Sequence, residues 1–535
     1  MALMPRIERT VERRGRIALF ALGMACFVCA RPADAQYPSV PPPPPCHKAG
    51  SSPASATSGV HPSRSLGVVL FQNTATDAND AFLGRAVDIR LADAILATGA
   101  MSMVASQKFG YEALTTPRGA KTVAHALGVR YVLGGKVGRT GAGDIGLVAE
   151  LRRPSDGAVV WGLSKSTSMT GLPALIDQIT AGVVGAIDDA NSASNSASVR
   201  LAASGDAVSA DVIEHFMRGT YYSSLNTIRG YETALAQFDS AAKSDPGFAP
   251  AFANAALTIA TMLEWGWWNY GEDRVGQLTE RGLAATDRAL RLDSASARAW
   301  MARGSLLAFR NPRTYAGAFP AFRRAIAIAP GDAEAHHWYG RALMQVGERG
   351  TARREFEKAL ALSPADTRIL FDFAQLYRHD GSYNQACILL DSAIAASPTA
   401  AQVYVLRALT RARRGELRFA WADAETGGRL GWPYWSQAAS AIVDAASRDT
   451  TGARQRTDAI RKAAAKAGTR PQEWTGEYLA AALAAGGDKD RALALLENIR
   501  PRGARLWFAL TGPDFASLRR EPSYRSVVTS SRPRR

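Results

Sequence analysis

"RREFEKALALSP" (residues 353–364) has the pattern of an amphipathic helix ended by a proline, and "PAFRRAIAIAP" (residues 320–330) repeats that pattern. In each stretch an aromatic residue is followed three positions later by alanine and five positions after that by proline. The matched residues are Phe322, Ala325 and Pro330, and Phe356, Ala359 and Pro364. Since Pro330, Pro364 and Pro398 lie 34 residues apart, a unit of fixed length is repeated along the chain.

The repeated unit includes more positions than these three. Small residues recur at matched places and large apolar residues stand between them, which chance explains poorly at a fixed period. The units contain Ala234, Phe238, Ala241 and Pro246; then Trp300, Gly304, Ala318, Phe322, Ala325 and Pro330; then Gly340, Leu343, Ala352, Phe356, Ala359 and Pro364; then Ala374, Tyr377, Ala386, Leu390, Ala393 and Pro398.

This pattern resembles the tetratricopeptide repeat, a helix-turn-helix unit in which small residues let two helices touch. We therefore expect Gly304 and Gly340 at the closest approach of paired helices, and a proline at the end of each second helix. The resemblance implies an all-α tetratricopeptide solenoid over residues 209–430. Residues 431–535 are expected to form a degenerate repeat and a helical C-terminal cap, because an end repeat exposes an unpaired face.

The first 35 residues have the features of a secretory signal peptide. Five arginines precede the apolar run at residues 17–30, and an Ala-x-Ala motif predicts cleavage after Ala35. No later segment is expected to be long and apolar enough to span a membrane as a stable helix. We therefore expect a periplasmic or secreted protein whose residues 36–65, rich in proline and serine, form an extended tether.

Two cysteines remain after this cleavage. Cys46 lies in the tether and Cys387 in a predicted repeat helix. Export would permit a disulfide, but joining these two residues would tie a flexible tail to a buried helix. We therefore expect one buried thiol and one exposed thiol that is available for pairing between molecules.

Residues 66–190 alternate short apolar strands with helices, which predicts an α+β domain with a small mixed sheet. Strands are expected at residues 66–71 and 101–106, followed by three strands separated by the turns "TGAG" and "PSDG". "LGVRYVL" (residues 127–133), Asp156-Gly157 and Trp161 resemble the TolB-amino-terminal-like domain of bacterial envelope and signalling proteins. This resemblance implies an interaction or regulatory domain. Residues 191–208 are predicted to be a polar linker.

The first helix of each tetratricopeptide unit is expected to line a concave surface, where extended peptides bind in this family. Three arginines fall on it, and a guanidinium group can pair with the carboxylate of a peptide C-terminus or an acidic side chain. The predicted groove residues are Arg341, Arg368, Arg378, His337, Phe371, Gln375 and Met344. The alternative is that an arginine-rich chain places arginines on any solvated face. The Lys and Asn pattern of a carboxylate clamp is absent.

The insertion "WGWWNY" (residues 265–270) concentrates aromatic side chains. One interpretation is a stacking platform for a peptide or a sugar. The favoured alternative is that these side chains hold a long loop on neighbouring helices or pack the solenoid on the first domain. The platform would consist of Trp265, Trp267, Trp268 and Tyr270.

The chain of 535 residues carries a formal net charge of +16, without the run of basic residues that marks a nucleic-acid arm. His336 and His337 are adjacent, so they cannot face one metal ion as the histidines of an HExxH motif do. We expect a non-enzymatic, exported scaffold that binds protein or peptide partners and needs no metal or cofactor. The alternative is a periplasmic sensory or glycan-binding regulatory protein, and the oligomeric state stays open.

Overall fold

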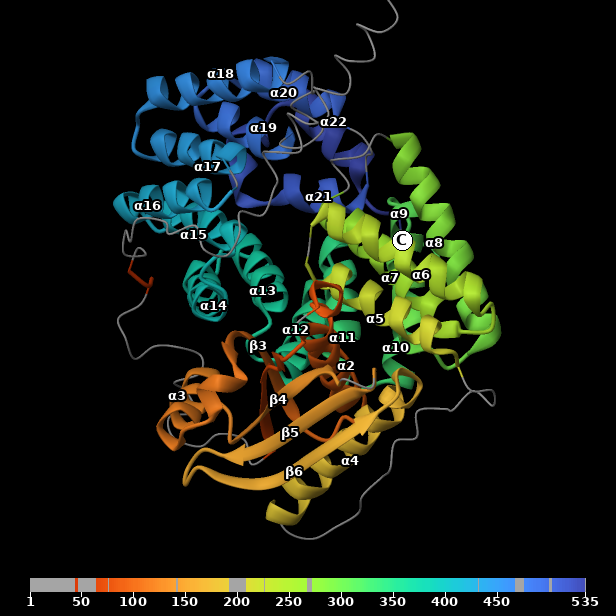
Figure 1. Cartoon of the computed structure of the whole chain (residues 1–535). Coiled ribbons are helices and arrows are strands. Elements are labelled where there is room, and N and C mark those ends of the chain that lie inside the picture. Colours follow the sequence, from red (N-terminus) through yellow and green to blue (C-terminus); the bar gives the residue numbers. More distant parts are fainter. Residues whose placement is uncertain are drawn as a thin grey trace, which may run out of the picture.

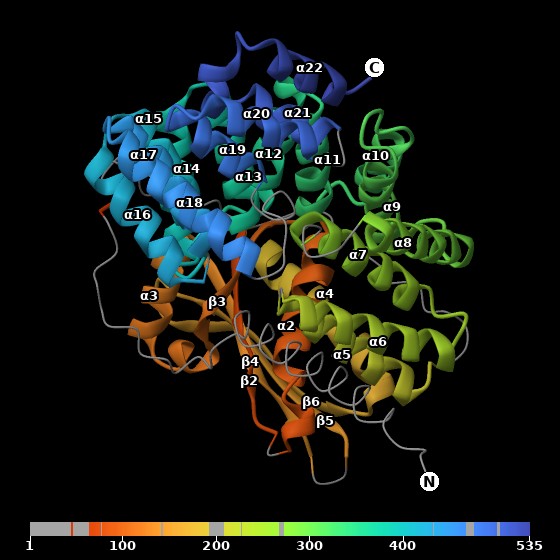
Figure 2. The same cartoon turned by 90° about the horizontal axis from the view of Figure 1, so that it is seen from above.

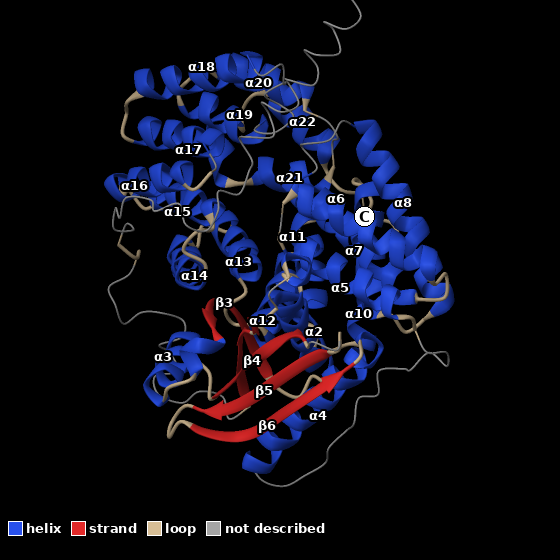
Figure 3. Ribbon diagram, in the orientation of Figure 1, coloured by secondary structure: helices blue, strands red, loops and turns tan. Residues whose placement is uncertain are grey.

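The computed structural model describes residues 44–46, 64–75, 77–140, 143–191, 208–225, 227–266, 272–431, 433–466, 476–499 and 503–534. A small mixed sheet with helices is followed by a long run of helices (Figures 1 and 3). This arrangement confirms the predicted fold class. The predicted signal peptide, most of the tether and most of the linker lie outside the described residues.

The sheet contains six strands in the order β3-β1-β4-β5-β6, with the short β2 beside β4. β1 is parallel to both β3 and β4, whereas β4, β5 and β6 form an antiparallel meander, so the sheet is mixed as predicted. The strands are β1 (Ser65–Leu70), β2 (Gln72–Asn73), β3 (Ser102–Gly110), β4 (Tyr131–Arg139), β5 (Ile145–Arg153) and β6 (Ala158–Thr167).

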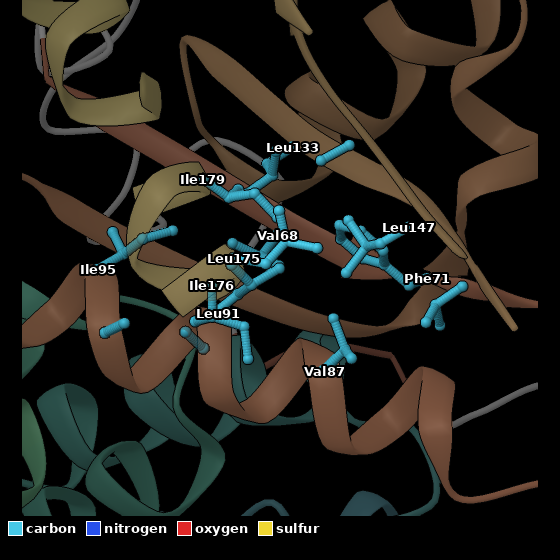
Figure 4. Close-up of a cluster of buried hydrophobic side chains, with 14 of the residues drawn as sticks. Val68, Phe71, Val87, Leu91, Ile95, Leu133, Leu147, Leu175, Ile176 and Ile179 are labelled. Carbon is cyan, nitrogen blue, oxygen red and sulfur yellow. The ribbon is translucent and has the colours of Figure 1, made fainter. Parts of the chain in front are cut away.

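Helices cover both faces of this sheet. On one face, α2 (Leu83–Ala97) and α4 (Leu172–Asn191) pack side chains such as Leu91 and Ile179 against Val68 of β1 (Figure 4). On the other face, α3 (Pro117–Leu127) packs Val123 against Val69, the next residue of β1. The alternation of Val68 and Val69 follows from the two-residue period of a strand.

The segment Met169–Asp188, which includes most of α4, is long and apolar enough by composition to cross a membrane. The expectation that no such segment follows the predicted signal peptide was therefore wrong. Leu172, Ile176, Ile179 and Val183 are all buried in the sheet core, which accounts for the apolar composition of this helix.

The rest of the described chain is helical, and successive helices pack as antiparallel pairs (Figures 1 and 2). The helices are α5 (Ala210–Ser224), α6 (Ile228–Ser244), α7 (Ala249–Gly266), α8 (Glu272–Leu292), α9 (Ala297–Arg310), α10 (Ala318–Ile328), α11 (Ala333–Gln345), α12 (Arg349–Leu362), α13 (Thr367–His379), α14 (Tyr383–Ala396), α15 (Ala401–Arg413), α16 (Leu417–Arg429), α17 (Pro433–Ala446), α18 (Thr450–Lys466), α19 (Gly476–Ala485), α20 (Lys489–Asn498), α21 (Ala504–Thr511) and α22 (Pro522–Ser531).

Glycines stand where paired helices touch. A Cβ atom on Gly304 of α9 would lie 2.7 Å from Cε1 of Phe322 on α10. A Cβ atom on Gly340 of α11 would lie 3.2 Å from Cδ1 of Phe356 on α12. The predicted close approach at both glycines is confirmed, and the large residue in each pair is the aromatic one of the repeated pattern.

The C-terminal part of the chain returns to an earlier part of the helical run. The backbone N–H of Ala504, at the start of α21, donates to the carbonyl of Pro312 at 2.7 Å. The N–H of Arg534, after α22, donates to the carbonyl of Arg313 at 2.6 Å. Pro312 and Arg313 lie in the connection between α9 and α10. The helical run is thereby closed on itself, with α21 on the inner side against α11 and α19 (Figure 1).

The α+β part packs directly on the helical run, where α2 lies beside α5 (Figures 1 and 2). Arg298 of α9 donates to Asp93 of α2 at 2.8 Å. Next to this ion pair the backbones come very close, since a Cβ atom on Gly331 would lie 2.5 Å from Cα of Gly99. The contact is therefore a tight interface and not a loose tether between two units.

A disulfide joins Cys46 to Cys387, with 5.8 Å between their Cα atoms. The expectation that these cysteines would not pair with each other was wrong. Cys387 is buried in α14 as predicted. However, the short segment 44–46 lies against that helix, which brings Cys46 to the buried Cys387.

Candidate functional site on the inner helices

The predicted groove residues lie on two consecutive inner helices, α11 and α13. Each helix begins at an aspartate N-cap. Asp332 accepts the backbone N–H of Glu334 at 2.9 Å, and Asp366 accepts that of Arg368 at 2.8 Å. Such caps satisfy backbone donors that an α-helix leaves unpaired at its first turn. Because both caps stand at the same place in their repeats, equivalent positions of the two helices face the same side.

Three of the predicted residues converge on Asp372, a fully buried residue of α13. Nε2 of His337 lies 2.9 Å from Oδ2 of Asp372, and Nε2 of Gln375 donates to Oδ1 at 2.9 Å. Nη1 of Arg341 donates to Oδ2 at 3.4 Å. Burial alone would raise the pKa of Asp372, but Arg341 and His337 outweigh it and hold the pKa below its usual range.

Arg341 has a second acidic partner. Its guanidinium group pairs with Glu264 of α7, and Arg341 is 7% exposed. The arginine therefore lies between a carboxylate of α7 and a carboxylate of α13, and its charge is compensated inside the protein. This arrangement joins three inner helices, and it leaves Arg341 no open face towards solvent.

Arg368 is the most accessible of the three predicted arginines, with 40% of its side chain exposed. It pairs with Glu334 of α11 at 3.0 Å and with the N-cap Asp366 at 3.0 Å. Burial would raise the pKa of Asp366, but Arg368 outweighs it and lowers the pKa to about 2. The accessible part of its guanidinium group makes Arg368 the predicted groove residue best placed to meet an external carboxylate.

Arg378 binds a carboxylate of the chain itself. Its Nη2 donates to both oxygens of Asp514 at 2.6 Å, and Asp514 also accepts from Nη2 of Arg413 at 3.2 Å. Burial would raise the pKa of Asp514, but Arg378 outweighs it and holds the pKa below its usual range. Asp514 lies in η7 (Pro513–Leu518), directly after α21.

Aromatic side chains of α21 contact the same inner face. The ring of Phe508 stacks on His379 at a centroid distance of 4.4 Å. A Cβ atom on Gly347 would lie 2.9 Å from the indole ring of Trp507, so only glycine leaves room for that ring. Phe508 shares a buried cluster with Met344, and Phe371 and Trp507 pack against it. The inner face of α11 and α13 is therefore occupied by the chain's own residues 504–514.

Sequence reasoning placed the groove residues on one face but missed Gly347, His379, Arg413 and the occupying segment. Gly347 and His379 carry a weak signal, since each stands at the end of a first helix in its repeat. Asp514 and Phe508 carry none, because they are more than a hundred residues away and lie outside the regular repeats.

The aromatic platform cannot be placed in the same way. Trp267, Trp268 and Tyr270 lie outside the described residues, and Trp265 belongs to α7 without a described side chain. Among the residues that the structure describes, no group of three or more His, Cys, Asp and Glu side chains is arranged to hold a metal ion.

The family model of the tetratricopeptide repeat matches residues 333–376. The matched range contains α11, α12 and most of α13, which are the helices that carry the groove residues. No curated protein matches the chain.

Solved structures similar to the chain include tetratricopeptide proteins of low identity. PilW, a type IV pilus biogenesis factor, is 19% identical, with a TM-score of 0.34, 39% of this chain and 92% of that chain covered. PilF of Pseudomonas aeruginosa is 19% identical, with a TM-score of 0.32 and coverages of 42% and 95%. Yeast Tom70 is 15% identical, with a TM-score of 0.36 and coverages of 62% and 70%. At these TM-scores the likenesses carry no functional argument. Residues 333–376 thus match a tetratricopeptide repeat, and they lie within a run of paired helices.

Proposed function

We propose that the protein is an exported interaction scaffold that binds segments of other proteins on the inner face of its helical run. The observation that carries this proposal is the occupation of that face by residues 504–514 of the chain itself. Phe508 stacks on His379, and Asp514 pairs with Arg378 and Arg413. A surface with these contacts already recognises a polypeptide segment.

The chemistry of this internal segment indicates which partner would fit. A helical turn with neighbouring aromatic residues fills the space above Gly347 and beside His379. A carboxylate six residues after the second aromatic residue reaches the two arginines. The partner would therefore be a short helical segment with an aromatic pair followed by an acidic residue, and it would have to displace residues 504–514. Arg368 would add a contact at the edge of this face.

The disulfide supports the proposed export. Disulfides persist in secreted and periplasmic proteins, whereas the cytosol keeps thiols reduced. Together with the apolar segment and the Ala-x-Ala motif before Gln36, the bridge between Cys46 and Cys387 favours an oxidising compartment. We also propose the domain boundaries that the sequence predicts. They lie at residues 35, 65, 190, 208 and 430.

Affinity capture from native envelope extract would test this function, with the chain starting at Gln36 as bait. A Trp507→Ala bait should retain more of a specific partner, because its own segment holds the inner face less tightly. An Arg368→Glu bait should retain less. Arg354→Glu is the matched control, because Arg354 is an exposed residue of α12, the outer helix of the preceding repeat. A partner whose recovery is the same with all four baits would contradict binding at the inner face.

A further inference from the structure

Residues Pro44, Pro45 and Cys46 lie against α14 and the C-terminal end of α15, on the side of the helical run away from α21 (Figure 1, red segment). They are separated from the next described residue, Arg64, by seventeen residues. The contacts of this short segment involve neither the inner face nor the α+β part. What holds the segment there is therefore independent of the proposed function.

The segment is held through its main chain. The N–H of Cys46 donates to Oδ2 of Asp391 at 2.7 Å. The carbonyl of Pro44 accepts from Nη2 of Arg411, and the carbonyl of Cys46 accepts from Nη2 of Arg414 at 3.5 Å. The protein thus contacts the carbonyl of Pro44 and both the N–H and the carbonyl of Cys46. These main-chain contacts select an extended backbone, and the proline rings make no polar contact.

The residues that bind the segment are fixed by a buried charge network. Arg411 has no solvent exposure, and its Nη1 donates to Oδ2 of Asp423 at 2.7 Å. Asp423 also accepts from Nε of Arg407 at 2.9 Å, and Nη1 of Arg407 donates to Asp391 at 2.7 Å. Asp391 and Arg411 are thus held by side chains of α15 and α16 as well as by the segment.

Arg411 has a further contact that concerns the thiol. Its Nε lies 3.3 Å from Sγ of Cys46, and its Nη2 meets the carbonyl of Pro44. The carbonyl of Pro44 thus gives an acceptor to a guanidinium group that is buried when the segment is bound. A guanidinium group beside a cysteine also stabilises the thiolate, the form that takes part in disulfide exchange.

From these contacts we infer that Asp391, Arg411 and Arg414 form a binding site for an extended, cysteine-bearing peptide segment, which the site recognises through its main chain before Cys387 bonds to it. The occupant is the chain's own Pro44–Cys46. The site directs Cys46 to Cys387, and it will accept the same three residues from a separate peptide.

The covalent step is an ordinary thiol–disulfide exchange. In the chain itself, the Cys46 thiolate attacks a disulfide donor such as oxidised glutathione and releases one thiolate. The Cys387 thiolate then attacks Sγ of Cys46 and releases the second thiolate. The two cysteines lose two electrons, and the donor gains them as it is reduced to two thiols.

A peptide capture experiment tests the site. The protein is the chain from Gln36 with Cys46→Pro, which removes both the thiol and the N–H from its own segment and leaves Cys387 as the remaining cysteine. The probe is acetyl-Pro-Pro-Cys-amide, activated as a mixed disulfide with thionitrobenzoate. Cys387 attacks the peptide sulfur, thionitrobenzoate leaves, and its colour reports the rate. Mass spectrometry confirms the attachment at Cys387.

The matched control is the same peptide with a methyl group on the cysteine nitrogen. In this peptide a methyl group replaces the hydrogen that donates to Asp391, and the protein is unchanged. We expect the folded protein to capture the unmethylated peptide about tenfold faster, the effect of one hydrogen bond to a charged acceptor. In urea the two peptides should react equally fast. Equal rates with folded protein, or capture only in urea, would overturn the inference.

A pair of protein variants identifies the arginine. Arg411→Met, in the same Cys46→Pro background, should slow capture of the unmethylated peptide about tenfold. Arg429→Met changes an exposed arginine of α16 and should leave the rate unchanged. Circular dichroism shows whether the Arg411→Met protein is folded. A folded Arg411→Met protein that captures the peptide at the original rate would contradict the role of Arg411.

Discussion

The carboxylate of Asp514 balances the positive charges of two arginines that come from different repeats. Arg378 and Asp514 are largely buried, with 10% and 14% of their side chains exposed, and Arg413 approaches from α15. Removing one partner of a buried ion pair leaves a charge that the protein can no longer compensate. This carboxylate therefore decides whether the C-terminal segment stays on the inner face.

Asp514→Asn should lower the free energy of unfolding by about 3–5 kcal/mol, because Arg378 remains buried without a counter-charge. Urea unfolding followed by tryptophan fluorescence measures this change. The control is Asp239→Asn, which breaks an exposed pair with Arg281 and should cost at most about 1 kcal/mol. An equal loss of unfolding free energy in the two variants would show that the buried pair stabilises the protein no more than an exposed pair does.

Asp88 gives the α+β part a pH dependence. It is buried, its Oδ1 accepts the N–H of Phe71 at 2.8 Å, and burial raises its pKa to about 7. In the unfolded chain the pKa is about 3.9, so the folded state binds the proton more tightly. The stabilisation is complete below about pH 4 and is lost as the pH rises through about 7.

Asp88→Asn should therefore flatten the decrease in unfolding free energy between pH 5 and pH 8, because asparagine keeps the acceptor for Phe71 and cannot ionise. Urea titrations at the two pH values test this for both proteins. Asp239→Asn serves as the comparison, since an exposed carboxylate should leave the wild-type decrease intact. If the unfolding free energy of Asp88→Asn fell as steeply between pH 5 and pH 8 as that of the wild type, another group would be responsible for the pH dependence.

The sequence predicted which groove residues share a face but not what they bind. The repeat register places Arg341, Arg368 and Arg378 correctly on α11 and α13. Apart from Asp366, the N-cap beside Arg368, their carboxylate partners come from three sources: the next repeat, as with Asp372; an earlier one, as with Glu264; and the C-terminal segment, as with Asp514. A register defined within one repeat contains no information about such distant partners.

At the scale of elements, periodic patterns in the sequence predicted the strands and helices correctly. They did not predict how these elements are placed relative to one another. The strands at residues 66–71 and 101–106 correspond to β1 and β3, and the predicted three-stranded meander is β4 to β6. The helical repeats were found because small residues, large apolar residues and prolines recur at matched positions of successive units. The course of α21 was not predictable, because its position depends on side chains of α11, α13 and α19 together.

The contact between the α+β part and the helical run depends on two glycines. Gly331→Ala should destabilise the protein by about 1–3 kcal/mol, because the new Cβ atom would meet the backbone of Gly99 and one side must shift. Urea unfolding and limited proteolysis measure the effect. Gly276→Ala is the control. It lies within α8 with nothing within 4 Å of the new atom, and it should stabilise the helix by roughly 0.5–1 kcal/mol. Similar results for both variants would contradict the tight interface.

At the scale of the whole molecule, the disulfide links residues that are 341 positions apart. A bridge that closes a long loop restricts the unfolded chain, and such bridges contribute about 2–5 kcal/mol. Reduction should therefore lower the thermal midpoint of the wild-type protein. It should leave the midpoint of Cys46→Pro unchanged, and that variant should melt near the reduced wild type. Equal midpoints for oxidised and reduced wild type would show that the bridge adds no stability.

The sequence could not reveal this bridge for a physical reason. It indicated a flexible segment and a buried cysteine, and that combination argues against pairing. The charge network of Arg407, Arg411, Asp391 and Asp423 holds the segment in place, and its members come from α14, α15 and α16. Only their arrangement in space shows that an extended backbone fits beside Cys387.

The return of the C-terminus to Pro312 and Arg313 has a consequence for how the protein unfolds. In a linear array each repeat touches only its neighbours, so the last repeat can open by itself and the opening can spread inwards. Here the start of α21 and the residues after α22 are bonded to the connection between α9 and α10, and these bonds restrain this part of the helical run against opening by itself. During synthesis, the inner face must also wait for residues 504–514 before its aromatic and charged side chains find their partners.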